Sequence, residues 1–195
     1  MNYLQLREDL EKACHQAASV GIQTGSGGNV SARIPEQELM LVKASGSGFA
    51  DASVDGFVIT DFEGKLVEGA GKPTREALLH GLIYKNYPKV QAVVHTHSPY
   101  SIALAHFCKE IERVTWHSQL KIVNSIPVID IPSAMVRSED IPVVEELFSH
   151  NAELKAFVLK GHGLVAFGKS IIDAEQTAEL VEETAMIAFL ERLGK

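Results

Sequence analysis

The chain has few cysteines and contains no long apolar run. Cys14 and Cys108 are its only cysteines, and 195 residues are enough to bury a core without disulfides. No apolar stretch approaches the roughly 18 residues that a membrane-spanning helix needs. The amino-terminal segment MNYLQLREDLEKA is amphipathic and acidic, unlike a secretory signal. These absences argue against a membrane or secreted protein and predict a cytoplasmic one.

The chain also has no cluster of positive charge. Its 25 acidic residues outnumber 18 basic ones, which gives a formal net charge of −7, and the lysines and arginines are scattered. No segment could therefore follow a phosphate backbone, and nucleic acid is excluded as an expected partner. Apolar residues make up 46% and charged residues 22%, as in folded globular proteins. Without repeats, low-complexity tracts or a linker, residues 1–195 are expected to form one domain.

The apolar pattern predicts helices that alternate with β-hairpins. Helices are expected at 3–19, 74–86, 99–107 with Ser98 as cap, 139–150 with Ser138 as cap, and after Ser170, which caps the last helix. Strands are expected at 30–34, 39–44, 90–97, 114–118 and 127–131, and in two hairpins at 57–68 and 156–167. Tight hairpins make neighbouring strands antiparallel. The prediction is therefore an α/β domain in which helices cover a mainly antiparallel sheet.

Two histidines one residue apart end an apolar strand in Val93-Val94-His95-Thr96-His97-Ser98. In a strand they point to the same side, with backbones roughly 6 to 7 Å apart. Two imidazoles at that separation can both reach one metal ion. A lone H-x-H is more often a pair of ordinary structural histidines, so the rest of the chain must decide between the two interpretations.

A third candidate ligand is His162, which lies between two glycines in Gly161-His162-Gly163, at the middle of a β-patterned pair. Such a position displays the ring on a turn. Three histidines with a fourth position open are typical of catalytic zinc. His162 together with His95 and His97 therefore favours a metal site.

Catalysis at that site needs a base, and Glu76 precedes the metal strand on the expected helix. Alternatively, Glu76 is an acidic residue placed there by the helix dipole. His80 shares a helix face with Glu76 and is either a ligand or a hydrogen-bonding neighbour of one.

Three segments favour anions. The loop Thr24-Gly25-Ser26-Gly27-Gly28-Asn29 and the segment Ala44-Ser45-Gly46-Ser47-Gly48 offer unobstructed backbone N–H groups, and Thr74 with Arg75 stands at a helix amino terminus. Each alone is an ordinary turn or helix start. Beside a metal site, the three together suggest a phosphorylated or carboxylated ligand.

The motifs G-G-N-V-S-A-R, K-A-S-G, K-P-T-R-E, H-T-H-S and G-H-G, in this order along nearly the whole chain, resemble the class II aldolase and adducin head family. That family includes fuculose-phosphate and rhamnulose-phosphate aldolases, ribulose-phosphate 4-epimerase and a methylthioribulose-phosphate dehydratase. The resemblance implies a three-layer α/β/α sandwich around a mainly antiparallel sheet. It also implies a ring of four subunits with the active site at a subunit boundary.

The resemblance assigns roles to particular residues. It makes His95, His97 and His162 the ligands of a divalent metal, usually zinc, with cobalt or manganese as alternatives. Glu76 becomes the acid/base, and it also approaches the metal in the empty site. The substrate phosphate is assigned to the residues of the three anion-favouring segments, namely Gly28, Asn29, Ser45, Gly46 and Thr74, and we add Arg75 to this set. The implied reaction is aldol cleavage of a ketose phosphate through a zinc-stabilised enediolate.

Two departures from the family's aldolases bear on the substrate. Arg75 stands where aldolases often have a second small hydroxyl residue, and it either grips phosphate or carboxylate as a fork or points away. The aldolases' tail with its tyrosine proton donor has no counterpart, because no tyrosine follows Tyr100. His117 lies near where some aldolases place a tyrosine that reaches a neighbouring subunit, and it is either a proton donor or a structural histidine.

Three functions are therefore compared. The first is a metal-dependent aldolase acting on a small sugar phosphate. The second is a dehydratase, 4-epimerase or decarboxylase on a related phosphate. The third is a non-catalytic, adducin-like assembly module, which has no need of H-T-H, G-H-G and Glu76 together.

Overall fold

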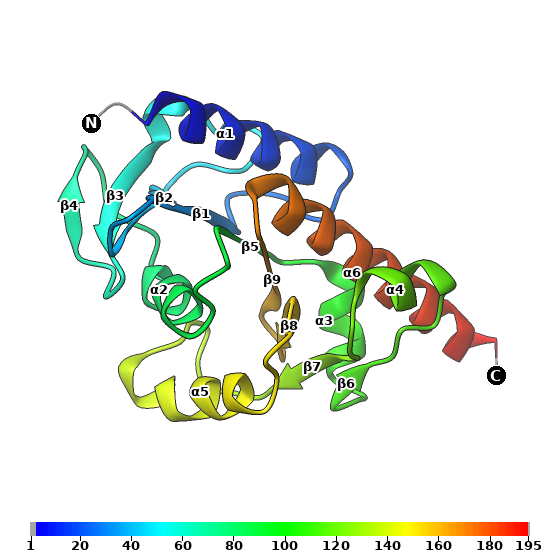
Figure 1. Ribbon diagram of the computed structural model, residues 1–195. Coiled ribbons are helices and arrows are strands. Elements are labelled where there is room, and N and C mark those ends of the chain that lie inside the picture. The colour runs from blue at the N-terminus through cyan, green and yellow to red at the C-terminus, as the bar shows by residue number, and fades with distance from the viewer. Residues whose placement is uncertain (1–2, 195) are drawn as a thin grey trace.

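A nine-stranded sheet runs through the middle of the computed structural model, which describes residues 3–194 (Figure 1). In spatial order its strands are β4 (Leu66–Glu68), β3 (Phe57–Asp61), β2 (Leu39–Lys43), β1 (Asn29–Arg33), β5 (Ala92–Thr96), β9 (Gly163–Gly168), β8 (Ala156–Leu159), β7 (Ile126–Ile129) and β6 (Glu110–Ile111). Every neighbouring pair is antiparallel except β7 with β8. The prediction of a mainly antiparallel sheet is confirmed.

Helices cover both faces of this sheet (Figure 1). One face packs against α1 (Leu4–Ser19), α3 (Pro99–Ala105) and α6 (Ile171–Leu193), and the other against α2 (Ala77–Asn86) and α5 (Ile141–Ser149). Successive strand residues alternate between the two layers: Val94 packs towards α6, whereas Val93 packs towards α2. The three-layer α/β/α arrangement is therefore confirmed. No helix within residues 3–194 is both long and apolar enough to cross a membrane.

The short helix α4 (Trp116–Lys121) corrects the strand predicted at 114–118. Thr115 and Ser118 form a reciprocal capping box, in which the Thr115 hydroxyl accepts the Ser118 backbone N–H and the Thr115 backbone N–H is bonded to the Ser118 hydroxyl. These local bonds satisfy the amino end of a helix and override the β propensity of Val114, Thr115 and Trp116. Among the described residues, the only strand in this region is β6, which ends at Ile111, before the predicted segment begins.

Two predicted helix starts and one predicted capping bond also need correction. Helix α2 begins at Ala77 and leaves Glu76 at the cap position, because Pro73 forms a bridge with Ala44 and holds the preceding segment extended. Helix α5 begins at Ile141 after a 3₁₀ turn at Ser138–Asp140, so Ser138 is not its cap. Ser98 does stand at the start of α3, but its hydroxyl donates to the Ile22 carbonyl oxygen and makes no capping bond. Ser170 caps α6 as predicted, by accepting from the Asp173 backbone N–H.

Candidate metal centre

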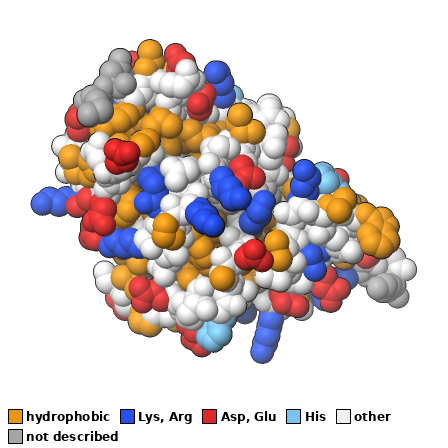
Figure 2. Space-filling model, viewed as in Figure 1, with side chains coloured by type: hydrophobic (Ala, Val, Ile, Leu, Met, Phe, Trp, Pro, Cys, Tyr) orange, Lys and Arg blue, Asp and Glu red, His pale blue; other side chains and the backbone are white. Residues whose placement is uncertain are grey.

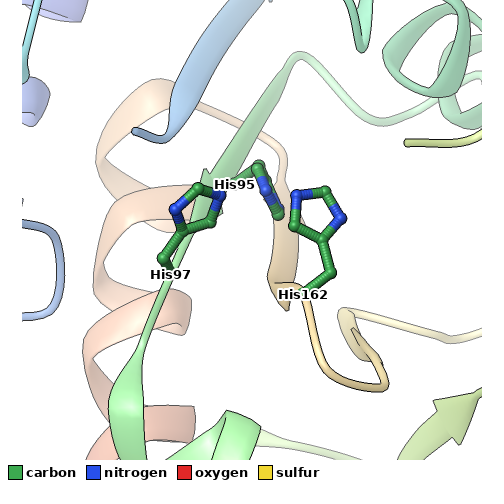
Figure 3. A group of neighbouring side chains, drawn as sticks. All are labelled: His95, His97 and His162. Carbon is green, nitrogen blue, oxygen red and sulfur yellow. The ribbon is translucent and has the colours of Figure 1, made fainter. Parts of the chain in front are cut away.

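The end of β5 and the turn between β8 and β9 bring three imidazole rings together. Figure 3 shows His95 and His97 at the end of β5 and His162 on the loop that enters β9, with the rings turned towards one another. One ligand atom from each ring lies within 4.8 Å of the other two. These distant parts of the sequence meet here because β5 and β9 are neighbouring strands, with His95 opposite Val165.

The ring of His95 is completely buried and fixed in orientation. Its Nδ1 lies 2.9 Å from the Leu164 carbonyl oxygen, so Nδ1 carries the proton and Nε2 presents a lone pair to the site. Burial lowers the pKa of His95 to about 3 and that of His162 to about 4. Both rings are therefore neutral at physiological pH, which is the form that binds a metal.

Two glycines let the backbone approach these rings closely. A Cβ on Gly163 would lie 2.4 Å from the Thr96 carbonyl oxygen and 2.9 Å from the His95 ring, and one on Gly27 would lie 2.4 Å from Nδ1 of His97. Any larger residue at either position would displace a candidate ligand. At these two positions glycine therefore serves the close packing of backbone around the rings.

Glu76 lies directly against the three-histidine group. Its Oε2 is 3.1 Å from His95 Nε2 and its Oε1 is 3.6 Å from His162 Nδ1, while Asn29 donates to Oε2 at 3.2 Å. Burial raises the pKa of this carboxyl above its ordinary value. His95 Nε2 faces Glu76 Oε2 with a lone pair, so the imidazole nitrogen and the carboxylate oxygen repel each other unless a cation or a proton lies between them.

Buried polar atoms without partners indicate whether these residues fit a metal ion. Glu76 Oε1, His95 Nε2 and His162 Nδ1 are all buried and have no hydrogen-bond partner among the described residues. Buried polar atoms without partners are costly, at about 1–3 kcal/mol each. A divalent cation held by the three imidazoles would satisfy these atoms together, so the donor set fits a divalent metal.

All of the residues predicted to bind phosphate line one cavity beside this group. The cavity holds about 580 Å³, and its wall includes Gly28, Asn29, Ser45, Gly46, Thr74, Arg75, Glu76, His97 and His162. Hydrogen bonds join the three segments in pairs. The Ser45 backbone N–H donates to the Lys72 carbonyl oxygen at 2.8 Å, the Ser45 hydroxyl donates to the Pro73 carbonyl oxygen at 3.0 Å, and Asn29 at the end of the glycine-rich loop donates to Glu76. The structure thus places the predicted anion-binding segments around one cavity together with His97 and His162, while His95 is buried behind its wall.

His117 lies outside the three-histidine group and outside the cavity beside it. It is exposed on α4, 4.0 Å from the Glu183 carboxylate, and lines a separate cavity of about 340 Å³. His80 is buried under the site on α2 and bonds Ser31. Within one copy of the chain neither residue belongs to the three-histidine group.

Several site residues were missed from the sequence. Lys43, Lys72, Ala134 and Met135 also line the cavity, and Gln23 joins the glycine-rich loop to His97. Lys43 and Lys72 stand inside the motifs K-A-S-G and K-P-T-R-E, so the signal was present. Met135 comes from the segment after β7, far from every motif, and only the fold places it here.

Comparison with known proteins gives a consistent result. The family model described as Class II Aldolase and Adducin N-terminal domain matches residues 8–189. A 3-oxo-tetronate 4-phosphate decarboxylase of Haemophilus influenzae is 32% identical over 173 residues, covering 87% of this chain and 80% of the relative. An L-fuculose phosphate aldolase of Methanococcus maripaludis is 31% identical over 180 residues, covering 92% and 93%.

A third relative has another activity, since an L-ribulose-5-phosphate 4-epimerase of Salmonella paratyphi C is 30% identical over 201 aligned positions, covering 96% of this chain and 86% of the relative. Among solved structures, YgbL from Escherichia coli superposes with a TM-score of 0.82 at 29% identity, covering 96% and 89%. An L-fuculose-1-phosphate aldolase from Thermus thermophilus superposes with a TM-score of 0.82 at 22% identity, covering 97% and 95%, which speaks for the fold alone.

Proposed function

The chain belongs to the class II aldolase and adducin family, and we propose that it is a metal-dependent lyase that cleaves a small ketose phosphate by aldol cleavage. One observation carries the proposal: three clustered imidazoles and the buried carboxyl group of Glu76 lie at one end of a cavity, which His97, His162 and Glu76 line together with the glycine-rich loop segments. An assembly module without catalysis would not need this set of groups. The relatives include aldolase, epimerase and decarboxylase at about 30% identity.

His95, His97 and His162 are the residues that would hold the metal, with zinc, cobalt and manganese as the candidates. When bound, such a cation acts as a Lewis acid that polarises a substrate carbonyl and stabilises the negative charge left when the adjacent carbon–carbon bond breaks. The Leu164 carbonyl keeps His95 in the required tautomer.

Glu76 is the proposed acid/base. It lies within 3.1 Å of His95, and Asn29 holds one of its oxygens, so the other is free to take or return the proton at the reacting carbon. Its burial keeps competing water away and favours the protonated form. Both properties suit a group that exchanges a proton during each turnover.

The phosphate is proposed to lie against the three loop segments. Gly28 and Gly46 have positive φ angles of 71° and 110°, which turn successive backbone N–H groups in a way that L-residues with side chains rarely allow. Ser45 and Thr74 add hydroxyls at the same wall, and Asn29 adds an amide. A dianion held there would leave the rest of a small sugar pointing at Glu76 and the histidines.

Arg75 favours a second candidate, decarboxylation of a phosphorylated 3-oxo acid. Arg75 and Lys72 both line the cavity, and Glu76 is the only acidic residue of its wall within residues 3–194. Together with Lys43 they make three cations beside backbone that already suits a phosphate, which leaves the Arg75 guanidinium fork for a carboxylate. In that reaction the bond to the carboxylate breaks, carbon dioxide leaves, its electron pair passes to the neighbouring carbonyl, and Glu76 protonates the carbon.

A homotetramer with the site at a subunit boundary is also proposed. Trp116 and Leu120 on α4 are 83% and 82% exposed, and hydrophobic side chains protrude on the right of Figure 2, where Figure 1 places α4. Large exposed apolar side chains are common in contacts between subunits. His117 lies on the same helix, so an interface at α4 could carry it to a neighbouring cavity as a proton donor.

The test is to load the protein with zinc, cobalt or manganese and to offer ketose 1-phosphates and phosphorylated 3-oxo acids. Release of dihydroxyacetone phosphate supports the aldolase, and release of carbon dioxide supports the second candidate. If the metal is verifiably bound and neither product forms, both are wrong.

Glu76→Gln should abolish turnover while zinc still binds, because the amide cannot exchange a proton. Glu63→Gln is the matched control, since Glu63 is exposed and pairs with Lys85 outside the cavity. Full activity of the Glu76→Gln variant would contradict the assignment of the acid/base.

A further inference from the structure

Helix α2 and strand β1 are joined by a series of polar side chains that are buried except for the half-buried Arg33 at its far end. The helix contributes one residue every four positions, and the strand contributes one every two positions on the face towards α2. These six residues, which we call the polar ladder, are Glu76, His80 and Tyr84 opposite Asn29, Ser31 and Arg33. Ladder contacts of this kind are unusual between a helix and the apolar face of a sheet, where Val42, Val58 and Val93 surround them.

The three ladder residues of the helix and the three of the strand span nearly the same distance. Eight helical residues advance about 12 Å, and four strand residues advance about 13 Å. Each helix residue can therefore meet its own strand residue without bending either element. Rotating α2 by one residue, or sliding it by one turn, would break all of these contacts together.

The contacts are short and specific. Asn29 donates to Glu76 Oε2 at 3.2 Å, and the Ser31 hydroxyl lies 2.7 Å from both His80 Nδ1 and the Tyr84 hydroxyl. Arg33 donates to the Tyr84 carbonyl oxygen, and its guanidinium carbon lies 4.9 Å from the centre of the Tyr84 ring. The Ser31 hydroxyl thus links His80, in the middle of the ladder, to Tyr84 at its far end.

His80 occupies the central position of the ladder on α2. It is completely buried, as is Ser31, and its Nε2 has no partner among the described residues. Its backbone N–H donates to the Glu76 carbonyl oxygen at 3.2 Å, one helical turn away. For stability alone, a leucine would fill this space without leaving a buried ring nitrogen unbonded. What His80 does provide is a directional tie from α2 to β1, next to Glu76.

We propose that the polar ladder, through the His80–Ser31 bond, sets the position of the Glu76 carboxylate at the metal site. His80 and Ser31 are then positioning residues: neither contacts the cavity, and both act through Glu76. The part of this inference that concerns turnover rests on the proposed function. The part that concerns the position of α2 does not.

The test compares three variants loaded with zinc. His80→Leu removes the tie at similar volume, His80→Asn keeps a polar group near the place of Nδ1, and Thr60→Val is the control. Thr60 is a completely buried residue on β3 whose hydroxyl lacks a partner among the described residues, and it lies outside the ladder and the cavity. Removing its hydroxyl changes a buried polar group without touching α2's ties.

In His80→Leu we expect kcat to fall about 10- to 100-fold, since displacements near 1 Å can cost that much. KM should change less than about threefold, because substrate binding groups are unaltered. Zinc affinity should stay near that of the wild type, and hydrogen exchange of the peptide spanning 74–84 should accelerate. His80→Asn should recover most of kcat and of the protection, and Thr60→Val should match the wild type throughout.

Equal kcat in His80→Leu and Thr60→Val would overturn the proposal, and so would a loss of zinc that accounts for the loss of turnover. If the wild type turns over none of the substrates, the proposed function fails, and hydrogen exchange alone decides the ladder: unchanged exchange at 74–84 in His80→Leu overturns it. If His80→Leu does not fold, Ser31→Ala replaces it, with an expected fall in kcat of about tenfold and the same overturning results.

Discussion

The carboxamide of Gln23 offers the sharpest prediction about the metal centre, because it joins the glycine-rich loop to a candidate ligand. The side chain is 2% exposed. Its Oε1 accepts the His97 backbone N–H at 2.7 Å, and its Nε2 donates to the Thr24 carbonyl oxygen at 2.6 Å. Gly27 and Gly28 pack directly on the same carboxamide. Gln23→Met keeps the length of the side chain and removes both bonds.

Two bonds are lost, and one of them leaves a backbone N–H without its partner. An intramolecular hydrogen bond contributes about 0.5–1.5 kcal/mol, and an unsatisfied buried group costs about 1–3 kcal/mol. We expect the free energy of unfolding to fall by about 1.5–3 kcal/mol in the zinc-free protein. With a urea slope of about 2–3 kcal/mol per molar, the midpoint of unfolding should shift by about 0.5–1.5 M.

The zinc affinity should fall as well, by about 10- to 100-fold, which is the usual effect of losing a group that orients a ligand. The assay is competition against a chromophoric chelator at fixed pH, together with urea unfolding of the same preparation. Gln23→Glu is the matched variant: it can still accept from His97, but it repels the Thr24 carbonyl, so zinc binding should be retained better than in Gln23→Met. Wild-type zinc affinity in Gln23→Met would refute the coupling between loop and ligand.

Three further predictions concern other parts of the molecule. Gly163→Ala should cost about 1–3 kcal/mol of stability and most of the zinc affinity, because its Cβ would meet the Thr96 carbonyl at 2.4 Å; urea unfolding and zinc titration check this, and unchanged binding would contradict it. Burial, and to a lesser extent the neighbouring Glu179, raises the pKa of Glu175. The folded protein therefore holds this proton more tightly than the unfolded chain, and the wild type loses stability as pH rises above the ordinary carboxyl range. Glu175→Gln should therefore raise Tm at pH 9 more than at pH 5, and an equal gain at both would count against it. Leu120→Glu should lower the solution mass measured by light scattering, whereas an unchanged mass would exclude α4 from the proposed interface.

The strands were predictable because their signals are local. Alternating apolar residues and hairpin turns need only neighbouring positions, so the strand containing His95 and the hairpin around His162 were found from the sequence. The strand predicted at 114–118 was wrong although its signal is local: Val114, Thr115 and Trp116 favour a strand, but the reciprocal capping box of Thr115 and Ser118 starts a helix. In so short a segment two side-chain bonds outweigh β propensity.

The predicted start of α2 was wrong because it depends on a contact with Ala44, which is distant in the sequence. Thr74 and Pro73 are good residues for a helix amino terminus, yet the bridge between Pro73 and Ala44 extends this segment and moves the first helical residue to Ala77. That bridge forms only when β2 is already paired in the sheet. Glu76 consequently lies at the cap, where its side chain turns into the cavity.

By itself the sequence determined the chemistry that is available: three histidines on strand ends, one acid before them, and glycine-rich loops that suit an anion. Only the tertiary structure decided which of these groups meet. His162 reaches His95 because β5 and β9 pair, Met135 reaches the cavity from a segment with no motif, and His80 is tied to Ser31 across two layers. The physical reason is that periodicity and capping act over a few residues, whereas these contacts depend on how strands and layers pack at long sequence separation.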